Sequence, residues 1–171
     1  MELWELTDGD GVPQGKMYDR HSGDPIPEGY FFRVAEVWVR IGDKTLVTRR
    51  HPNKWAGLLW EVPGGGVLAG EEPRAAAARE LSEEAGISAD PESLQKISVT
   101  RHKNAIVYSF LLELSELPEI TLQPTEVVDF RFATSEGLDQ LSPEMTLGTS
   151  ERLSLVREYI AEHSAAKQKA R

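Results

Sequence analysis

Acidic side chains gather in one short segment of this chain, residues 80–84. Glu80 and Glu83 are three residues apart, and Glu80 and Glu84 are four apart, so on a helix all three lie on one face. Like charges at this spacing repel one another, and a bound divalent cation removes that repulsion. Carboxylate oxygens suit Mg²⁺ or Mn²⁺, ions that also bind substrate phosphates. The spacing therefore predicts a metal site that handles phosphorylated molecules.

The neighbouring residues predict the elements that position these carboxylates. Pro73 suits the first turn of a helix, an alanine-rich run follows it, and Gly86 suits a left-handed helix end. We therefore expect a helix over about 72–85, with Leu81 on the opposite, core-facing side. Before it, a short strand leads into Gly64-Gly65-Gly66. A glycine loop brings backbone groups close to a bound ion or anion, which favours a functional site over an ordinary solvated acidic face.

The segment 65–87 resembles the signature of the Nudix hydrolase family at every fixed position. The signature reads Gly-x5-Glu-x7-Arg-Glu-apolar-x-Glu-Glu-x-Gly-apolar, and here it runs from Gly65 through Glu71 and Arg79 to Ile87. The resemblance implies the Nudix fold, an α/β fold with a mixed sheet sandwiched between helices, here with an N-terminal β-hairpin extension. It also implies a pyrophosphohydrolase that acts on small-molecule diphosphates and uses Mg²⁺, for which Mn²⁺ can substitute.

The same resemblance implies roles for individual residues. The implied metal ligands are Glu80, Glu83, Glu84 and the backbone carbonyl of Gly65. Glu83 and Glu84 are also implied to be catalytic through the metal. Glu71 and Arg79 match positions that support the ligands by ion pairing rather than by touching the substrate.

The general base is a separate question. Glu84 can act as the base, but many relatives take it from a glutamate outside the signature. Our first candidate is Glu126, at the start of a predicted strand, and it competes with Glu113, Glu116 and Glu119. The alternative for each of these four residues is a solvated loop carboxylate.

Basic residues before the glycine loop are candidates for binding the substrate. Arg49, Arg50 and Lys54 suit phosphate oxygens, although a solvated hairpin end is the alternative. Four aromatic residues either stack on a base or, as is more common, pack in the core: Trp4, Phe31, Trp38 and Trp55.

Two other functions compete with hydrolysis. Residues 49–54 and 58–60 also resemble the isopentenyl diphosphate isomerase branch of the family. Those isomerases use a catalytic cysteine shortly after this point, and this chain has no cysteine, so hydrolysis is favoured. The second alternative is a non-catalytic, Nudix-like nucleotide-binding sensor. Such regulators usually carry a degraded signature, whereas this one is complete.

Composition limits the remaining possibilities. The chain has 171 residues, 40% of them hydrophobic and 27% charged, which fits a single globular domain over 1–171. The net charge of −9 without a basic cluster disfavours binding to duplex nucleic acid. The four histidines lack zinc-ligand spacing, and no apolar run has the length of a membrane span. The chain start does not resemble a signal peptide, so we expect a cytoplasmic protein, with a homodimer left open.

Residue patterns predict the remaining elements of a layered α/β domain. An N-terminal hairpin and linker occupy 1–29, and a frayed tail occupies 164–171. Alternation and β-branched residues predict strands over 31–40, 44–49, 58–62, 95–101, 105–114 and 126–133. We also predict a short helix that ends at Leu141 with Ser135 as its cap, and a last helix over about 149–163.

Overall fold

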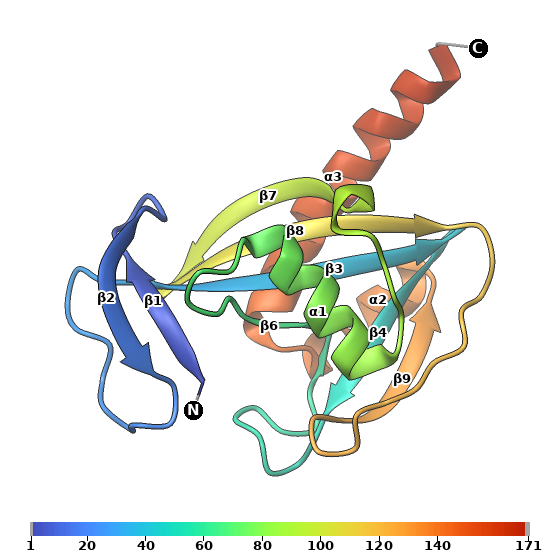
Figure 1. Cartoon of the computed structure of the whole chain (residues 1–171). Helices are drawn as coiled ribbons and strands as arrows, with labels where there is room; N and C mark the ends of the chain where they lie inside the picture. The colour runs from blue at the N-terminus through green and yellow to red at the C-terminus, as the bar shows by residue number, and fades with distance from the viewer. Residues whose placement is uncertain (1, 170–171) are drawn as a thin grey trace.

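The structure is a computed structural model that describes residues 2–169, with side chains up to residue 163. The strands are β1 (Leu3–Thr7), β2 (Pro13–Asp19), β3 (Phe32–Ile41), β4 (Lys44–Arg50), β5 (Trp60–Glu61), β6 (Gly64–Gly66), β7 (Gln95–His102), β8 (Ala105–Leu114) and β9 (Val127–Ala133). The α-helices are α1 (Pro73–Ala85), α2 (Ser135–Leu141) and α3 (Leu147–Lys169), and short 3₁₀ turns cover Pro91–Ser93 and Ser142–Glu144. Figure 1 shows α1 on one face of the sheet and α3 on the other.

The central sheet is mixed, as predicted. Its strand order is β5-β4-β3-β8-β7, with β6 paired to β3 and β9 paired to β4. β3 and β8 run parallel along their whole length, from Phe32↔Ala105 to Ile41↔Leu114, while β7 and β8 are antiparallel. The long parallel pair is buried on both faces because helices cover both sides of it.

The strands β3 and β4 separate soon after the turn that joins them. They pair only at Arg40↔Thr45 and Ile41↔Lys44. Beyond this point β6 occupies the edge of β3, at Val34↔Gly66, and β5 occupies the edge of β4. Residues 60–66 therefore lie between two diverging strands, which places the glycine loop at the opening of the sheet.

Two apolar clusters hold the layers together. The α1 side contains Ala35, Val37, Val39, Leu46, Val67, Ala76, Ala77, Leu81, Ala85, Phe110 and Leu112, among others. The α2 and α3 side contains Trp38, Val47, Trp60, Val62, Leu111, Leu138, Leu141, Met145, Leu153 and Val156. Small alanines let α1 approach the sheet closely, which fixes the helix that carries the three glutamates.

A buried ion pair also ties α3 to the sheet. Arg152 donates from Nε to Glu36 Oε1 at 2.7 Å and from Nη2 to Oε2 at 2.5 Å. Ser109 Oγ and Trp38 Nε1 donate to the same carboxylate at 2.7 and 2.9 Å. The charge on Glu36 is therefore buried with a full set of donors, which a buried carboxylate requires.

The helix ends agree with the sequence in part. Pro73 begins α1, and Gly86 follows it with a left-handed φ of 72°. The prediction that Ser135 caps the next helix is wrong. Thr134 is the cap, because its Oγ1 accepts the N–H of Gly137 at 3.2 Å and Ser135 is already helical. The last helix begins at Leu147, two residues earlier than expected.

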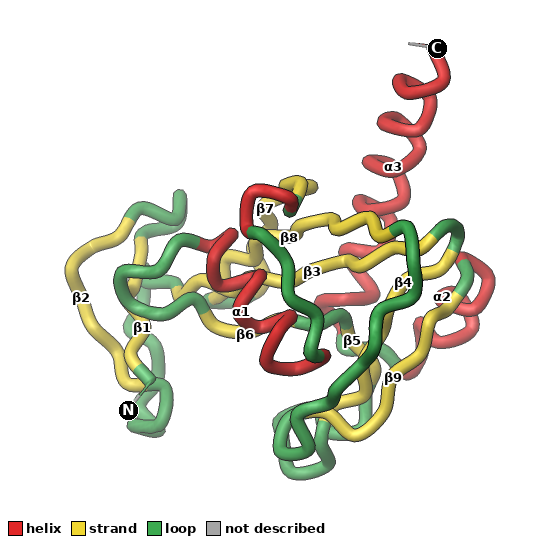
Figure 2. The backbone as a smooth tube through the Cα atoms, turned by 45° about the vertical axis from the view of Figure 1, so that its right-hand side comes forward, coloured by secondary structure: helices red, strands yellow, loops and turns green. Residues whose placement is uncertain are grey.

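Residues 164–171, predicted to be a frayed tail, have helical backbone as far as Lys169. Their side chains, and all of residues 170 and 171, lie outside the described residues. Figure 2 shows this end of α3 projecting beyond the sheet. Among the described residues, no helix combines the length and apolar character needed to cross a membrane.

The N-terminal hairpin, β1 and β2, is packed against the rest of the domain. Thr7 and Phe31 exchange backbone hydrogen bonds of 2.8 and 2.9 Å, and the Leu3 carbonyl accepts the Ala69 N–H at 2.9 Å. The guanidinium of Arg101 on β7 donates to the Gly9 carbonyl. The hairpin therefore has a defined position beside the glycine loop.

Candidate active site

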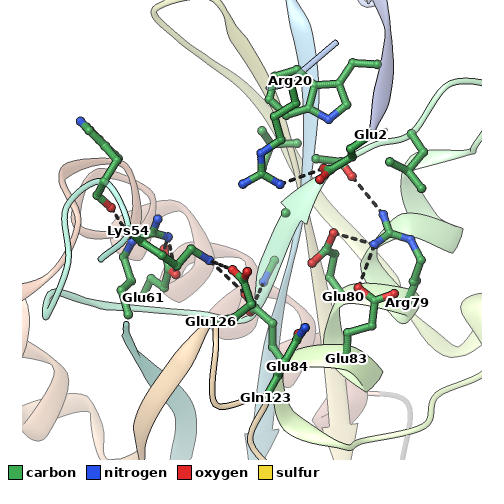
Figure 3. Close-up of a pocket in the computed structure, with 18 of the residues that line it drawn as sticks. Glu2, Arg20, Lys54, Glu61, Arg79, Glu80, Glu83, Glu84, Gln123 and Glu126 are labelled. Atoms are coloured by element: carbon green, nitrogen blue, oxygen red, sulfur yellow. Dashed lines mark hydrogen bonds and ion pairs between the residues drawn. The ribbon is translucent and has the colours of Figure 1, made fainter. Parts of the chain in front are cut away.

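One cavity of about 540 Å³ lies where the glycine loop, α1, the 51–59 loop and the N-terminal hairpin meet. Its acidic residues are Glu2, Glu61, Glu80, Glu83, Glu84 and Glu126. Its basic residues are Arg20, Arg50, Lys54 and Arg79. Figure 3 shows these charged groups pointing toward one another across the cavity. All three glutamates of the α1 face line this one space.

The glycine loop makes room for two of the three carboxylates. A Cβ at Gly65 would lie 2.4 Å from Cδ of Glu80, so the carboxylate rests directly against the backbone. A Cβ at Gly64 would lie 2.6 Å from the carbonyl oxygen of Ala35, and the Gly64 N–H donates to Glu84 Oε2 at 3.1 Å. A side chain at residue 65 would therefore separate α1 from the loop, and one at residue 64 would collide with β3, which explains why the chain needs glycine at both positions.

Arg79 organises the exposed half of the acidic face. Its Nε and Nη2 donate to the two oxygens of Glu71 at 2.9 and 3.0 Å, and its Nη2 also donates to the Gly66 carbonyl at 3.0 Å. Its Nη1 donates to Glu80 at 2.7 Å and to Glu83 at 3.2 Å. The hydrogen bond with Glu71 and the other carboxylates raise the pKa of Arg79. Arg79 therefore contacts two of the predicted ligands and the Gly66 carbonyl, and Glu71 reaches them through Arg79.

The three glutamates share the cavity but do not meet at one point. Glu80 and Glu83 turn toward Arg79, whereas Glu84 turns toward Gly64 and Lys54. In the part of the chain that the structure describes, no three acidic or histidine side chains are close enough together to hold a metal ion. The donor chemistry nevertheless fits Mg²⁺ or Mn²⁺, because hard carboxylate oxygens and backbone carbonyls surround the same space.

Burial leaves the ionised carboxylates of the site poorly stabilised by protein groups alone. Burial, helped by the nearby Glu61 carboxylate, raises the pKa of Glu84 to about 8, although Lys54 and the Gly64 N–H favour the ionised form. Burial likewise raises the pKa of Glu80 against the effect of Arg79, and that of Glu61 against the effect of Arg50. A bound cation would favour the ionised forms, so these shifts also fit a metal site.

Lys54 connects the predicted base to the predicted ligands. Its Nζ forms an ion pair with Oε2 of Glu126, and it lies 3.8 Å from Oε1 of Glu84. The side chain of Lys54 is only 16% exposed, while that of Glu126 is 36% exposed. A lysine from the 51–59 loop therefore lies close to both Glu84 and Glu126, and Figure 3 shows its side chain reaching toward these two carboxylates.

The structure separates Glu126 from its competitors. Glu126 lines the cavity, whereas Glu116 and Glu119 line a different pocket beside the end of α1. Glu113 lies on β8, 3.8 Å from Arg40, and does not line the cavity. Of the four candidate bases outside the signature, only Glu126 lines the same cavity as the α1 glutamates.

The two adjacent arginines of β4 have different surroundings. Arg50 lines the cavity, where its Nη1 donates to both oxygens of Glu61 at 2.6 and 2.7 Å and its Nε donates to the Trp55 carbonyl. Arg49 does not line the cavity. Its Nε donates to the Leu58 carbonyl at 2.9 Å, and its guanidinium lies 5.8 Å from the ring centre of Trp60. Successive residues of a strand point to opposite faces, so only one of the pair reaches the cavity.

The aromatic candidates also divide. Trp38 is fully buried in the core, while Trp55 is 76% exposed at the cavity and Trp4 lines the cavity from the hairpin. Sequence reasoning missed the hairpin residues Glu2 and Arg20 as part of the site. No local pattern marks them, because they reach the cavity only through the docking of the hairpin.

Comparison with known proteins identifies relatives of this chain. The family model described as "NUDIX domain" matches residues 31–154. An uncharacterized Nudix hydrolase of Listeria monocytogenes is 32% identical over 146 residues, which cover 82% of this chain and 85% of that protein. The crystal structure of DR0079 from Deinococcus radiodurans has a TM-score of 0.75 at 18% identity, covering 90% of this chain and 98% of that one. A bifunctional NMN adenylyltransferase/ADP ribose pyrophosphatase from Francisella tularensis, solved with AMP and a manganese ion, has a TM-score of 0.65 at 22% identity, covering 75% and 42%.

Proposed function

This chain belongs to the Nudix hydrolase family, whose members act on pyrophosphate bonds, and we propose that it is a Mg²⁺-dependent pyrophosphohydrolase for nucleoside diphosphates linked to another group. The linked group is a sugar, a further phosphate or a similar moiety. The observation that carries the proposal is the convergence of the α1 glutamates, the glycine loop and Glu126 on one cavity. A cytoplasmic location remains a prediction from the sequence.

Each residue of the site has a defined part in this proposal. Glu80, Glu83, Glu84 and the Gly65 carbonyl would hold the metal. The bound metal supplies positive charge to the phosphate oxygens and lowers the pKa of a coordinated water. Glu71 and Arg79 keep the ligands in place through the hydrogen bonds described above.

Glu126 is proposed to accept the proton of the attacking water. Water adds to one phosphorus, the bond from that phosphorus to the bridging oxygen breaks, and the proton passes to the Glu126 carboxylate. Lys54, which forms an ion pair with Glu126 in the structure, keeps that carboxylate oriented. When substrate enters, Lys54 and Arg50 are the cations on this side of the cavity that can contact phosphate oxygens.

A substrate panel tests the proposal directly. Purified protein is incubated with nucleotide sugars, ADP-ribose, nucleoside triphosphates, dinucleoside polyphosphates and non-nucleotide diphosphates, with Mg²⁺ or Mn²⁺, and product phosphates are measured. Turnover in heavy-oxygen water then shows which phosphorus is attacked. We expect metal-dependent hydrolysis of at least one nucleoside diphosphate derivative. Tight nucleotide binding without turnover across the panel would instead indicate a sensor.

A further inference from the structure

Arg20 is the one cavity cation that the N-terminal hairpin supplies, and it lies outside residues 31–154 that match the family model. It follows β2 directly, and its backbone N–H donates to the Glu2 carbonyl at 3.1 Å, which continues the hairpin pairing by one step. The hairpin is in turn fixed to β3 and to the loop before α1. The position of Arg20 at the cavity is therefore set by the fold.

The other three cavity cations are largely occupied by protein acceptors. Arg79 uses Nε, Nη1 and Nη2 on carboxylates and the Gly66 carbonyl. Arg50 uses Nε and Nη1 on the Trp55 carbonyl and Glu61. Lys54 lies between Glu84 and Glu126. Arg79 and Lys54 therefore cannot bind a substrate phosphate without giving up a partner, and Arg50 can offer only its Nη2.

Arg20 differs because half of its guanidinium is unused. Its Nη1 donates to Glu2 Oε1 at 2.8 Å, and its guanidinium lies 5.7 Å from the ring centre of Trp4. Among the described residues, Nε and Nη2 of Arg20 have no acceptor within hydrogen-bond distance. Its side chain is 41% exposed. Figure 3 shows Arg20 on the side of the cavity opposite Glu84 and Gln123.

We infer that Arg20 binds a phosphate oxygen of the substrate diphosphate from the side opposite the α1 glutamates. This inference rests on the proposed function. A guanidinium with free, planar donors matches phosphate geometry. The carboxylates that line the rest of the cavity repel a phosphate, so few other groups can bind it. The Trp4 ring, 5.7 Å from the guanidinium, attracts it toward this side of the cavity through a cation–π interaction. The N-terminal hairpin is therefore a substrate-binding element and not only a structural extension.

Glu2 provides a test that separates this role from a structural one. Were the Arg20–Glu2 ion pair only a brace for the hairpin, Arg20→Gln and Glu2→Gln would have the same effect. If Arg20 binds phosphate, the Glu2 carboxylate beside it repels the incoming phosphate, and the two substitutions act in opposite directions. Glu2→Gln removes the negative charge but keeps a group that can form hydrogen bonds at that position. His21 lies 3.7 Å from the other oxygen of Glu2.

The experiment measures binding of α,β-methylene-ADP and of methylenediphosphonate by calorimetry in Mg²⁺. We expect Arg20→Gln to raise Kd for both probes about tenfold or more, the usual effect of losing a charge-assisted hydrogen bond. Arg20→Lys should recover only part of the affinity, because it restores charge without the planar fork. Glu2→Gln should lower Kd a few-fold, and the double variant should show no such gain. Arg74→Gln is the matched control, since Arg74 has a similar exposure and a single partner, Glu92, away from the cavity.

The outcomes distinguish the two proposals. Wild-type protein that hydrolyses no member of the panel contradicts the proposed function. Wild-type protein that is active, but whose Kd values are unchanged by Arg20→Gln, overturns the inference about Arg20 alone. An effect on α,β-methylene-ADP without an effect on methylenediphosphonate also overturns it, because Arg20 would then contact the nucleoside. Equal weakening by Arg20→Gln and Glu2→Gln would show that the pair is a brace.

Discussion

The α1 and glycine-loop side of the cavity takes its charged groups from residues 65–84, whereas the rest of the lining comes from segments scattered along the chain. On the first side, Arg79 finds its carboxylate partners within eight residues. On the second side, Lys54 pairs with Glu126, and the N-terminal hairpin carries Arg20 and Glu2 to the cavity. The groups proposed to hold the metal are thus encoded together, while those proposed to bind the rest of the substrate are brought together by the fold.

This difference indicates how the site can change without losing its chemistry. Substitutions in the 51–59 loop or the hairpin alter the second side and leave the Arg79 network intact. Substitutions in α1 alter the face that is proposed to bind the metal. We therefore expect α1 variants to lose turnover, and variants of the second side to change affinity or pH dependence instead.

Loss of the Glu84 carboxylate should be the largest effect and the clearest test of the α1 side. We expect Glu84→Gln to lower kcat by roughly two to four orders of magnitude, as for loss of a group that acts directly in catalysis. The fold should persist, because burial raises the pKa of the Glu84 carboxyl and a neutral Gln avoids the cost of burying its ionised form. Glu83→Gln should also lose activity. Glu72→Gln, at the exposed N-cap of α1, is the control. Near-normal turnover by Glu84→Gln would contradict the metal assignment.

Removal of Arg79 should weaken Mg²⁺ binding on the α1 side, with a smaller loss of activity than Glu84→Gln. Arg79→Gln releases Glu71, Glu80 and Glu83 from a shared partner. We expect the Mg²⁺ concentration for half-maximal activity to rise about 10- to 100-fold, the usual consequence of losing a group that orients metal ligands. Arg74→Gln on the same helix controls for loss of positive charge. An unchanged Mg²⁺ dependence would mean that Arg79 is not needed to orient the ligands.

A substitution on the second side should have a smaller effect of a different kind. We expect Glu126→Gln to reduce kcat by on the order of tenfold to a hundredfold and to remove the acidic limb of the pH–rate profile. Glu119→Gln, which alters a separate pocket, should change neither quantity. If the Glu126→Gln profile matches that of the wild type, the proton acceptor is another group.

The smallest effect concerns stability of the metal-free protein. Glu84 has a pKa of about 8 in the folded protein against an ordinary value of 4.5, so the folded state binds its proton more tightly than the unfolded state. Stability from this group is therefore present at low pH and is lost as pH rises from about 4.5 toward 8, by on the order of 1 kcal/mol per pH unit. Thermal unfolding between pH 5.5 and 7.5 measures the slope.

Two comparisons check the origin of that slope. Glu84→Gln should flatten it, and Mg²⁺ should stabilise the wild type more at pH 7.5 than at pH 5.5, because metal binding requires ionised ligands. An identical slope in wild type and variant would assign the pH dependence to other groups.

The sequence was sufficient for elements whose signals are local. Pro73, the alanine run and Gly86 define α1 within one residue of the prediction, and the spacing of three glutamates places them along one cavity. The capping error at Ser135 has a simple cause. Thr134 and Ser135 are adjacent and chemically alike, and only the backbone conformation decides which one precedes the helix.

The sequence was not sufficient where long-range packing decides the result. Arg49 and Arg50 are adjacent and alike in the sequence, and only the docking of β5 and the 51–59 loop decides which of them reaches the cavity. The role of Arg20 depends on the pairing of Thr7 with Phe31, which has no local signature. Trp38 and Trp55 are the same residue type, yet one lies in the core and the other at the cavity rim.

The buried pair between Glu36 and Arg152 has a consequence for synthesis of the chain. The partners are 116 residues apart, so a nascent chain exposes Glu36 on β3 long before Arg152 leaves the ribosome. Until then, sheet assembly would bury the Glu36 carboxylate without Arg152, its charged partner, which is strongly unfavourable. We therefore expect the domain to complete its fold only after α3 has been translated, and chains that stop short of Arg152 to depend on chaperones or be degraded.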